Sequence, residues 1–260
     1  MALLAAIRLL TVLPLPARPP TAGELAAAGS YFPAVGLLIG LAMAAVALPL
    51  NHLLPQPVVA ALLLALLLGI TGGLHVDGLA DTCDGFFCNA ESPARRLEIM
   101  RDSRVGGYGV AGVVSLLLVQ YSSIASVPVG ALAASLALMA TLSRWAMTYA
   151  LVAFPYARPN LPTLPGESST GQAGGMGTPF QPASRPLTLL SATLFTLAAS
   201  VLLAGAAGVL LLAVVWLGTW IMARALMARL QGLTGDTYGA INEAIQALVL
   251  LFLLVVPPGL

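Results

Sequence analysis

The chain has 260 residues, of which 59% are hydrophobic and only 8% are charged, and its mean hydropathy is +0.95. A soluble domain carries about 25% charged residues, so this composition excludes a soluble globular protein and predicts an integral membrane protein. The formal net charge of +1 argues against nucleic-acid binding and against a polyacidic partner.

The first 14 residues look superficially like a signal peptide, but Arg8 interrupts the apolar stretch and Pro14 follows it. An interfacial helix retained in the mature protein is the better interpretation. Beyond it, each apolar run of spanning length must be helical, because lipid cannot satisfy a free backbone amide. We therefore predict an all-α, polytopic membrane bundle of about seven transmembrane helices, forming a single catalytic domain over residues 1–260. The runs lie at about 30–50, 57–74, 108–127, 130–154, 187–204, 208–228 and 240–257.

Threading these runs alternately across a bilayer places every charged connection on one side. That side carries residues 1–29, 75–107, 155–186 and 229–239, whereas the opposite turns and the C-terminal tail contain no Asp, Glu, Arg or Lys. The positive-inside rule then predicts a cytoplasmic N-terminus. The Pro- and Gly-rich segment 155–186 is interpreted equally well as a flexible cytoplasmic loop that gates a site or as a plain linker.

Three aspartates follow directly after the second apolar run. Asp77, Asp81 and Asp84 have i, i+4, i+7 spacing, so on a helix they share one face within an arc of about 60°. Three carboxylates on one helical face repel each other unless a positive charge lies between them. A hard divalent cation such as Mg²⁺ supplies that charge. A single Asp at a helix start could simply be a cap. His75 is a candidate metal ligand, a candidate general base, or a polar residue at the end of the span.

A second motif combines arginines with glycines before the third run. Arg101 and Arg104 flank Asp102 and Ser103. The two guanidinium groups can bind anions through paired hydrogen bonds, and Asp102 beside them is a further candidate metal ligand. Glycines 106, 107 and 109 follow at the start of a span, where backbone amides could meet phosphate oxygens. The motif predicts a phosphate site formed by Arg101, Ser103, Arg104, Gly106 and Gly107.

Two weaker signals come from the second half of the chain. Asp236 and Glu243 are seven residues apart on one helical face, although a capped turn explains Asp236 equally well. Arg144 lies inside the fourth run, where a charge faces a polar interior or a substrate, unless the side chain snorkels to the interface.

Carboxylates for a hard metal and donors for phosphate together indicate phosphoryl transfer at a cytosolic membrane site. The same residues resemble the cobalamin synthase (adenosylcobinamide-GDP ribazoletransferase) family. The resemblance is carried by 72–86 (GGLHVDGLADTCDGF), 96–109 (RLEIMRDSRVGGYG) and 233–240 (LTGDTYGA), with weaker similarity at 31–36 and 143–145.

This resemblance implies a magnesium-dependent, multi-pass enzyme of the bacterial inner membrane with its active site facing the cytoplasm. Its substrates would be adenosylcobinamide-GDP and α-ribazole or α-ribazole 5′-phosphate, and GMP would be released. The predicted roles are Mg²⁺ binding by Asp77, Asp81, Asp84 and Asp102, pyrophosphate binding by Arg101 and Arg104, and proton transfer by Asp84 or His75. The family commonly has Lys where this chain has Arg101.

Two alternatives belong to other classes. A CDP-alcohol phosphotransferase of lipid synthesis has an Ala-Arg pair after its first Asp-Gly, whereas here Ala80 is followed by Asp81. A divalent-cation or corrinoid transporter would hold its ligands near the bilayer midplane, whereas these acids follow the end of a span. The oligomeric state stays open, a homo-oligomer included.

Overall fold

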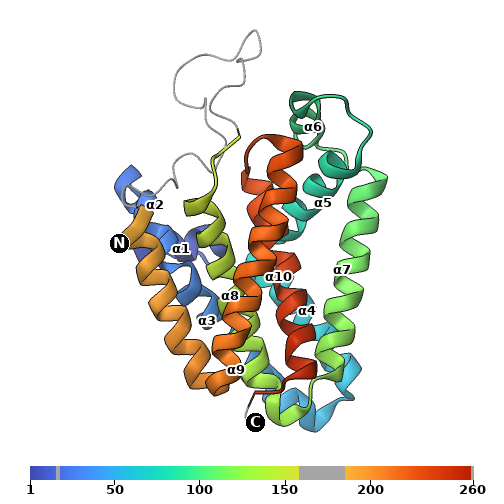
Figure 1. Cartoon of the computed structure of the whole chain (residues 1–260). Helices are drawn as coiled ribbons and strands as arrows, with labels where there is room; N and C mark the ends of the chain where they lie inside the picture. The colour runs from blue at the N-terminus through green and yellow to red at the C-terminus, as the bar shows by residue number, and fades with distance from the viewer. Residues whose placement is uncertain (16–17, 158–184, 259–260) are drawn as a thin grey trace.

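The computed structural model describes residues 1–15, 18–157 and 185–258, and over these ranges it is helical apart from loops and one isolated bridge between Tyr156 and Leu233. The predicted all-α class is confirmed. Most of the expected loop at 155–186 lies outside the described residues. Figure 1 shows the helices, which are α1 (Ala2–Leu10), α2 (Ala22–Ala28), α3 (Phe32–Leu53), α4 (Gln56–Thr71), α5 (Leu74–Phe87), α6 (Pro93–Ile99), α7 (Gly107–Ser126), α8 (Val129–Ala153), α9 (Arg185–Leu230) and α10 (Gly235–Val255).

Five helices in the described part of the chain are long and apolar enough to cross a membrane, or six if the bent pair α4 and α5 is counted as one span. The expected count of seven stays a prediction. Two of the expected runs fall within α9, which joins two helices across a kink at Gly205 (φ 56°, ψ −133°). A residue with a side chain rarely adopts such backbone angles, so glycine permits this turn.

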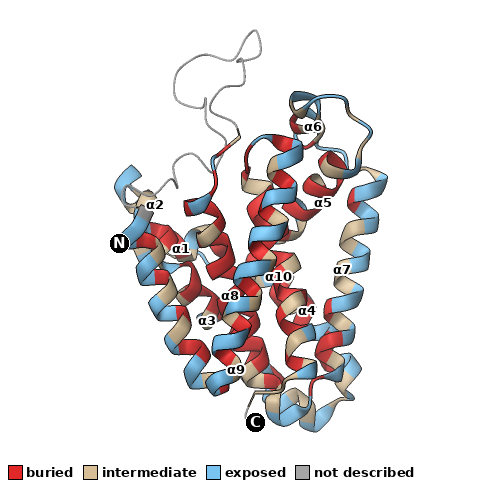
Figure 2. Cartoon of the chain, viewed as in Figure 1, coloured by how far each residue is buried: buried red, intermediate tan, exposed pale blue. Residues whose placement is uncertain are grey.

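The centre of the bundle is formed by α8 and α10, which are the most deeply buried spans (Figure 2). Helix α3 packs closely on α8, since a Cβ placed on Gly40 would lie only 2.6 Å from Cα of Ala137. Small residues let helices approach where lipid gives no hydrophobic drive for association. Helices α7 and α9 leave much of their apolar surface exposed, as expected for surfaces that face lipid.

The chain turns sharply between α4 and α5. Gly72 and Gly73 both adopt left-handed backbone angles (φ 64° and 71°), and the two helix axes differ in direction by 91°. The apolar run therefore ends at Thr71, and the acidic segment leaves as a separate helix. The N–H of Val12 donates to the Ile70 carbonyl at 2.9 Å, which ties the segment after α1 to this corner.

The charged connections lie at one end of the bundle. Figure 1 shows α6 and the turn from α9 into α10 at this end, with the C-terminus and the α7–α8 turn at the opposite end. This arrangement agrees with the charge asymmetry of the sequence. Which end faces the cytoplasm, and thus the orientation of the N-terminus, stays a prediction. The expected N-terminal helix is present as α1, with Ala5, Ala6 and Leu10 buried.

Candidate active site

All three aspartates of the first motif lie on α5, as their spacing predicted. Their environments differ greatly, however. Asp77 is exposed, Asp81 is partly buried, and the Asp84 side chain is buried in the protein. The shared helical face therefore does not give three equivalent carboxylates. Helix α10 approaches α5 at His75 and Gly78, whereas the start of α7 packs against Asp84.

The Asp84 carboxylate caps the start of α7. Its Oδ2 accepts the Gly106 N–H at 2.7 Å, and its Oδ1 accepts the Gly109 N–H at 2.8 Å. A carboxylate at a helix N-terminus satisfies amides that have no partner within the helix, and it also interacts favourably with the helix dipole. The Gly106 amide, which the sequence assigned to a phosphate site, thus binds a side chain of the protein itself, and so does the Gly109 amide.

Asp102 and Arg104 form an exposed pair beside this helix start. Asp102 Oδ2 lies 2.8 Å from Arg104 Nη2, and Oδ1 accepts both the Arg104 side-chain Nε–H and its backbone N–H. These hydrogen bonds lower the pKa of Asp102 to about 2, so the carboxylate is ionised at physiological pH. Ser103, Arg101 and Gly107 are exposed in the same stretch.

Arg96 holds the chain where it leaves α5. Its Nη1 donates to the carbonyl oxygens of Gly85, Phe86 and Cys88 at 2.8–3.0 Å, and its Nη2 donates to that of Ala90 at 2.9 Å. A guanidinium at a helix C-terminus satisfies carbonyls that lack partners and complements the dipole.

The Arg96→Lys variant is expected to loosen this turn, because an ammonium group cannot reproduce the planar fork. Loss of even one charged hydrogen bond, about 1.5 kcal/mol, should accelerate amide exchange in residues 85–92 by about tenfold, measured by mass spectrometry. Arg95→Lys is the matched control, since Arg95 forms only a surface pair with Glu98 and its replacement should leave exchange unchanged. Equal effects in the two variants would contradict the assignment.

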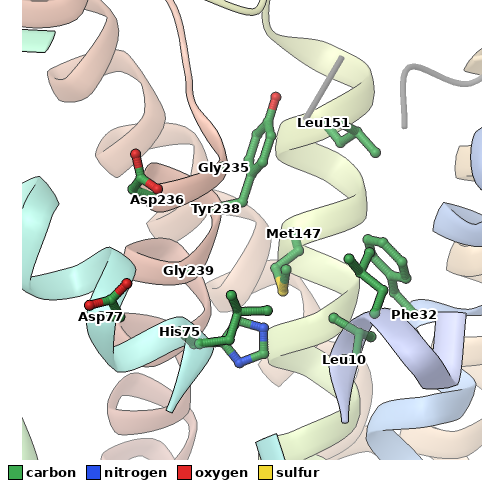
Figure 3. Close-up of a pocket in the computed structure, with 12 residues that line it drawn as sticks. Leu10, Phe32, His75, Asp77, Met147, Leu151, Gly235, Asp236, Tyr238 and Gly239 are labelled. Carbon is green, nitrogen blue, oxygen red and sulfur yellow. The ribbon is translucent and has the colours of Figure 1, made fainter. Parts of the chain in front are cut away.

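A pocket opens where α5 crosses the start of α10, and Figure 3 shows its lining. Helix α5 contributes His75 and Asp77, and α10 contributes Asp236 and Tyr238. The empty space between these residues is about 740 Å³, a figure that includes open solvent at the mouth. Its remaining lining is mostly apolar and consists of Leu9, Leu10, Phe32, Leu74, Met147, Leu151, Gly235 and Gly239.

Two glycines let α5 and α10 approach this closely. A Cβ on Gly78 would lie 2.7 Å from the Asp236 carbonyl oxygen, and one on Gly239 would lie 3.1 Å from Cα of His75. Asp236 itself follows Thr234, whose side chain caps the helix by accepting the Thr237 N–H. The segment 233–240 therefore caps α10 and also brings Asp236 to the pocket that Asp77 lines.

Arg144 and Glu243 belong to a buried polar cluster deeper in the bundle. Glu243 Oε1 accepts from Asn242 and Gln246 at 3.0 Å, and Oε2 accepts from Gln120 at 3.1 Å. Arg144 is fully buried and donates to the adjacent Ser143, while its Nε and Nη2 have no hydrogen-bond partner within the described residues. Arg144 thus faces the bundle interior and does not snorkel to the interface.

Sequence reasoning missed Gln120 and Gln246 in this cluster. Both are polar residues in runs that are otherwise apolar, at 108–127 and 240–257. Polar side chains inside a span usually face the bundle interior, and this signal could have found them.

Comparisons with known proteins indicate one family over nearly the whole chain. The sequence profile of the family described as cobalamin-5-phosphate synthase matches residues 2–254. The chain belongs to this family. A protein of a Roseiflexus species is 37% identical over 94% of this chain and 86% of its own length, and one from Stutzerimonas stutzeri is 38% identical over 95% of both chains. Both are named adenosylcobinamide-GDP ribazoletransferase. No solved structure matches significantly.

For this member of the cobalamin-5-phosphate synthase family, the four predicted metal ligands do not gather at one point. The described residues contain no group of three or more His, Cys, Asp or Glu side chains placed to hold a metal ion. Asp84 is engaged with α7, Asp102 with Arg104, and Asp81 does not line the pocket. The pair that shares the pocket is Asp77 and Asp236. Mg²⁺ is usually held by one or two carboxylates together with substrate phosphates, and this donor set fits that mode.

Proposed function

We propose that this protein is a magnesium-dependent adenosylcobinamide-GDP ribazoletransferase that completes cobalamin synthesis in the bacterial cytoplasmic membrane. Membership of the cobalamin-5-phosphate synthase family and the names of the relatives support this activity. The single structural observation that carries the proposal is the pocket that Asp77 and Asp236 both line. The start of α10, which contributes Asp236 to this pocket, lies at the same end of the bundle as α6 (Figure 1).

The reaction joins two substrates by phosphoryl transfer. The ribose 3′-hydroxyl, which is free both in α-ribazole and in α-ribazole 5′-phosphate, attacks the phosphorus that carries cobinamide. A new phosphorus–oxygen bond forms, the bond to the bridging pyrophosphate oxygen breaks, and GMP leaves. The proton of the attacking group is lost, and the side chains lining the pocket that can accept it are His75, Asp77 and Asp236.

Asp77 and Asp236 would hold Mg²⁺, which when bound neutralises phosphate oxygens and the leaving GMP. Arg101 and Arg104 supply positive charge for the pyrophosphate. The Arg104–Asp102 pair is solvent-exposed, and exposed ion pairs contribute little stability. A phosphate can therefore replace Asp102 as the partner of Arg104 at small cost.

The charged end of the bundle would face the cytoplasm. The basic residues of the connecting segments favour this orientation by the positive-inside rule, and nucleotide-activated substrates are cytosolic. The opposite end has apolar turns and lacks charged residues in the sequence.

Purified protein in liposomes is expected to form GMP and the cobalamin product in equal amounts when both substrates and Mg²⁺ are present. Omitting α-ribazole or adding EDTA should abolish both products, and comparing α-ribazole with its 5′-phosphate identifies the preferred acceptor. Release of CMP from a CDP-activated lipid would instead support the lipid enzyme. Corrinoid or cation uptake without any nucleotide release would support a transporter.

A further inference from the structure

The pocket has two chemically distinct sides. Helices α1, α3 and α8 form one side with Leu10, Phe32, Met147 and Leu151, whereas Asp77 and Asp236 lie on the other (Figure 3). An apolar cavity with a few polar groups at one side is typical of a site for a small organic ligand. The apolar part needs an occupant other than phosphate, because a phosphate cannot be desolvated favourably against four hydrophobic side chains.

His75 lies between the two sides, and its ring has no hydrogen-bond partner in the described part of the chain. Its side chain is only 2% exposed, yet neither ring nitrogen has a hydrogen-bond partner among the described residues. Buried polar groups are nearly always hydrogen-bonded, and leaving one unsatisfied is costly. A ligand in the pocket could therefore satisfy the imidazole.

We propose that this pocket binds the aromatic base of α-ribazole, with the His75 ring N–H donating to the free ring nitrogen of that base. This inference rests on the proposed function and assigns one substrate to one side of the site. The base is a dimethylated benzimidazole, which presents flat apolar surface and a single hydrogen-bond acceptor. Those features match an apolar wall with one buried imidazole.

The other substrate matches the pocket less well. Guanine has several donors and acceptors around its edge, and the apolar wall would leave many of them unsatisfied. The corrin ring is far larger than a benzimidazole and belongs outside the pocket. With the base held against Phe32 and Met147, the ribose and its 3′-hydroxyl extend toward the side that carries Asp77 and Asp236. The attacking oxygen is thereby presented to the predicted metal and pyrophosphate.

Filling the pocket tests the proposal. The Leu151→Trp protein is expected to bind α-ribazole at least tenfold more weakly by calorimetry. Its KM for α-ribazole should rise by a similar factor, while its KM for adenosylcobinamide-GDP stays within about twofold of wild type. Leu202→Trp is the matched control, because Leu202 is 85% exposed on the lipid-facing side of α9. Met147→Phe provides a smaller filling change if Leu151→Trp protein does not fold.

The His75 contact is tested with a ligand pair. Wild-type protein should bind α-ribazole about tenfold more tightly than its indole analogue, in which a C–H replaces the free ring nitrogen. In the His75→Phe protein this preference should disappear. A preference that is unchanged in His75→Phe would overturn the hydrogen bond.

The remaining outcomes separate this inference from the proposed function. If wild-type protein releases GMP but Leu151→Trp and Met147→Phe raise only the KM for adenosylcobinamide-GDP, the pocket holds the nucleotide and the inference is wrong. If wild-type protein releases no GMP, the proposed function fails. Calorimetry then tests the pocket assignment independently of activity. If wild-type protein binds α-ribazole and Leu151→Trp protein does not, the inference is supported. If Leu151→Trp protein binds it as tightly as wild type, or if wild-type protein does not bind it, the inference is refuted.

Discussion

Asp77→Asn protein is expected to release GMP at least about 10²-fold more slowly than wild type and to need a higher Mg²⁺ concentration for half-maximal rate. A neutral amide is a poorer ligand than a carboxylate for a hard cation. A bound metal contributes several kcal/mol of transition-state stabilisation, and each 1.36 kcal/mol corresponds to a factor of ten in rate. Asp236→Asn should behave in the same way, because both side chains line one pocket. The measurement is GMP release over a magnesium titration.

The double variant, Asp77→Asn with Asp236→Asn, should be little slower than either single one, since residues that act as a unit are strongly non-additive. Glu91→Gln is the control, because Glu91 is an exposed acid outside the pocket and its loss should leave the magnesium curve unchanged. Wild-type magnesium dependence in both Asp77→Asn and Asp236→Asn would refute this pair as the metal site.

Asp84→Asn protein is expected to be less stable by about 2–3 kcal/mol, because an amide cannot accept both the Gly106 and the Gly109 N–H as the carboxylate does. At this size that corresponds to a fall in Tm of roughly 5–10 °C, measured by thermal melting in detergent. At temperatures where the protein stays folded, its magnesium requirement should equal that of wild type. A raised magnesium requirement with unchanged Tm would instead make Asp84 a metal ligand, as the sequence predicts.

Two glycine variants test the same cap without altering the acid. A Cβ on Gly109 would lie 2.5 Å from Asp84 Oδ2, whereas a Cβ on Gly107 would meet nothing within 4 Å. Gly109→Ala should therefore lower Tm much as Asp84→Asn does, and Gly107→Ala should leave it unchanged. If the two alanine variants had the same Tm, the contact between Asp84 and the start of α7 would not be what stabilises this end of the bundle.

Several features were predictable because they depend on neighbouring residues alone. Apolar runs must form helices in lipid, and the spacing of Asp77, Asp81 and Asp84 placed them on one helix. The start of α7 at Gly107 was also expected. In contrast, the sequence indicated only a phosphate as the partner of these glycine amides. In the structure, the Gly106 and Gly109 amides donate to Asp84, which lies 22 and 25 residues earlier in the chain. Helix packing decides whether a side chain that distant reaches a given amide.

The sequence by itself determined that this is an all-α membrane protein with its charge gathered in a few connecting segments, and its motifs carried the family resemblance that the comparisons confirm. Hydropathy and helical periodicity are local properties, so a single chain displays them directly. Only the tertiary structure decided which acids act together. Asp77 lines the same pocket as Asp236, which lies 159 residues further along the chain, because glycines allow α5 and α10 to cross closely. Asp84, on the same helix as Asp77, instead faces α7 and caps it. Periodicity assigns a residue to a helix face, but the neighbouring helix determines that residue's chemistry.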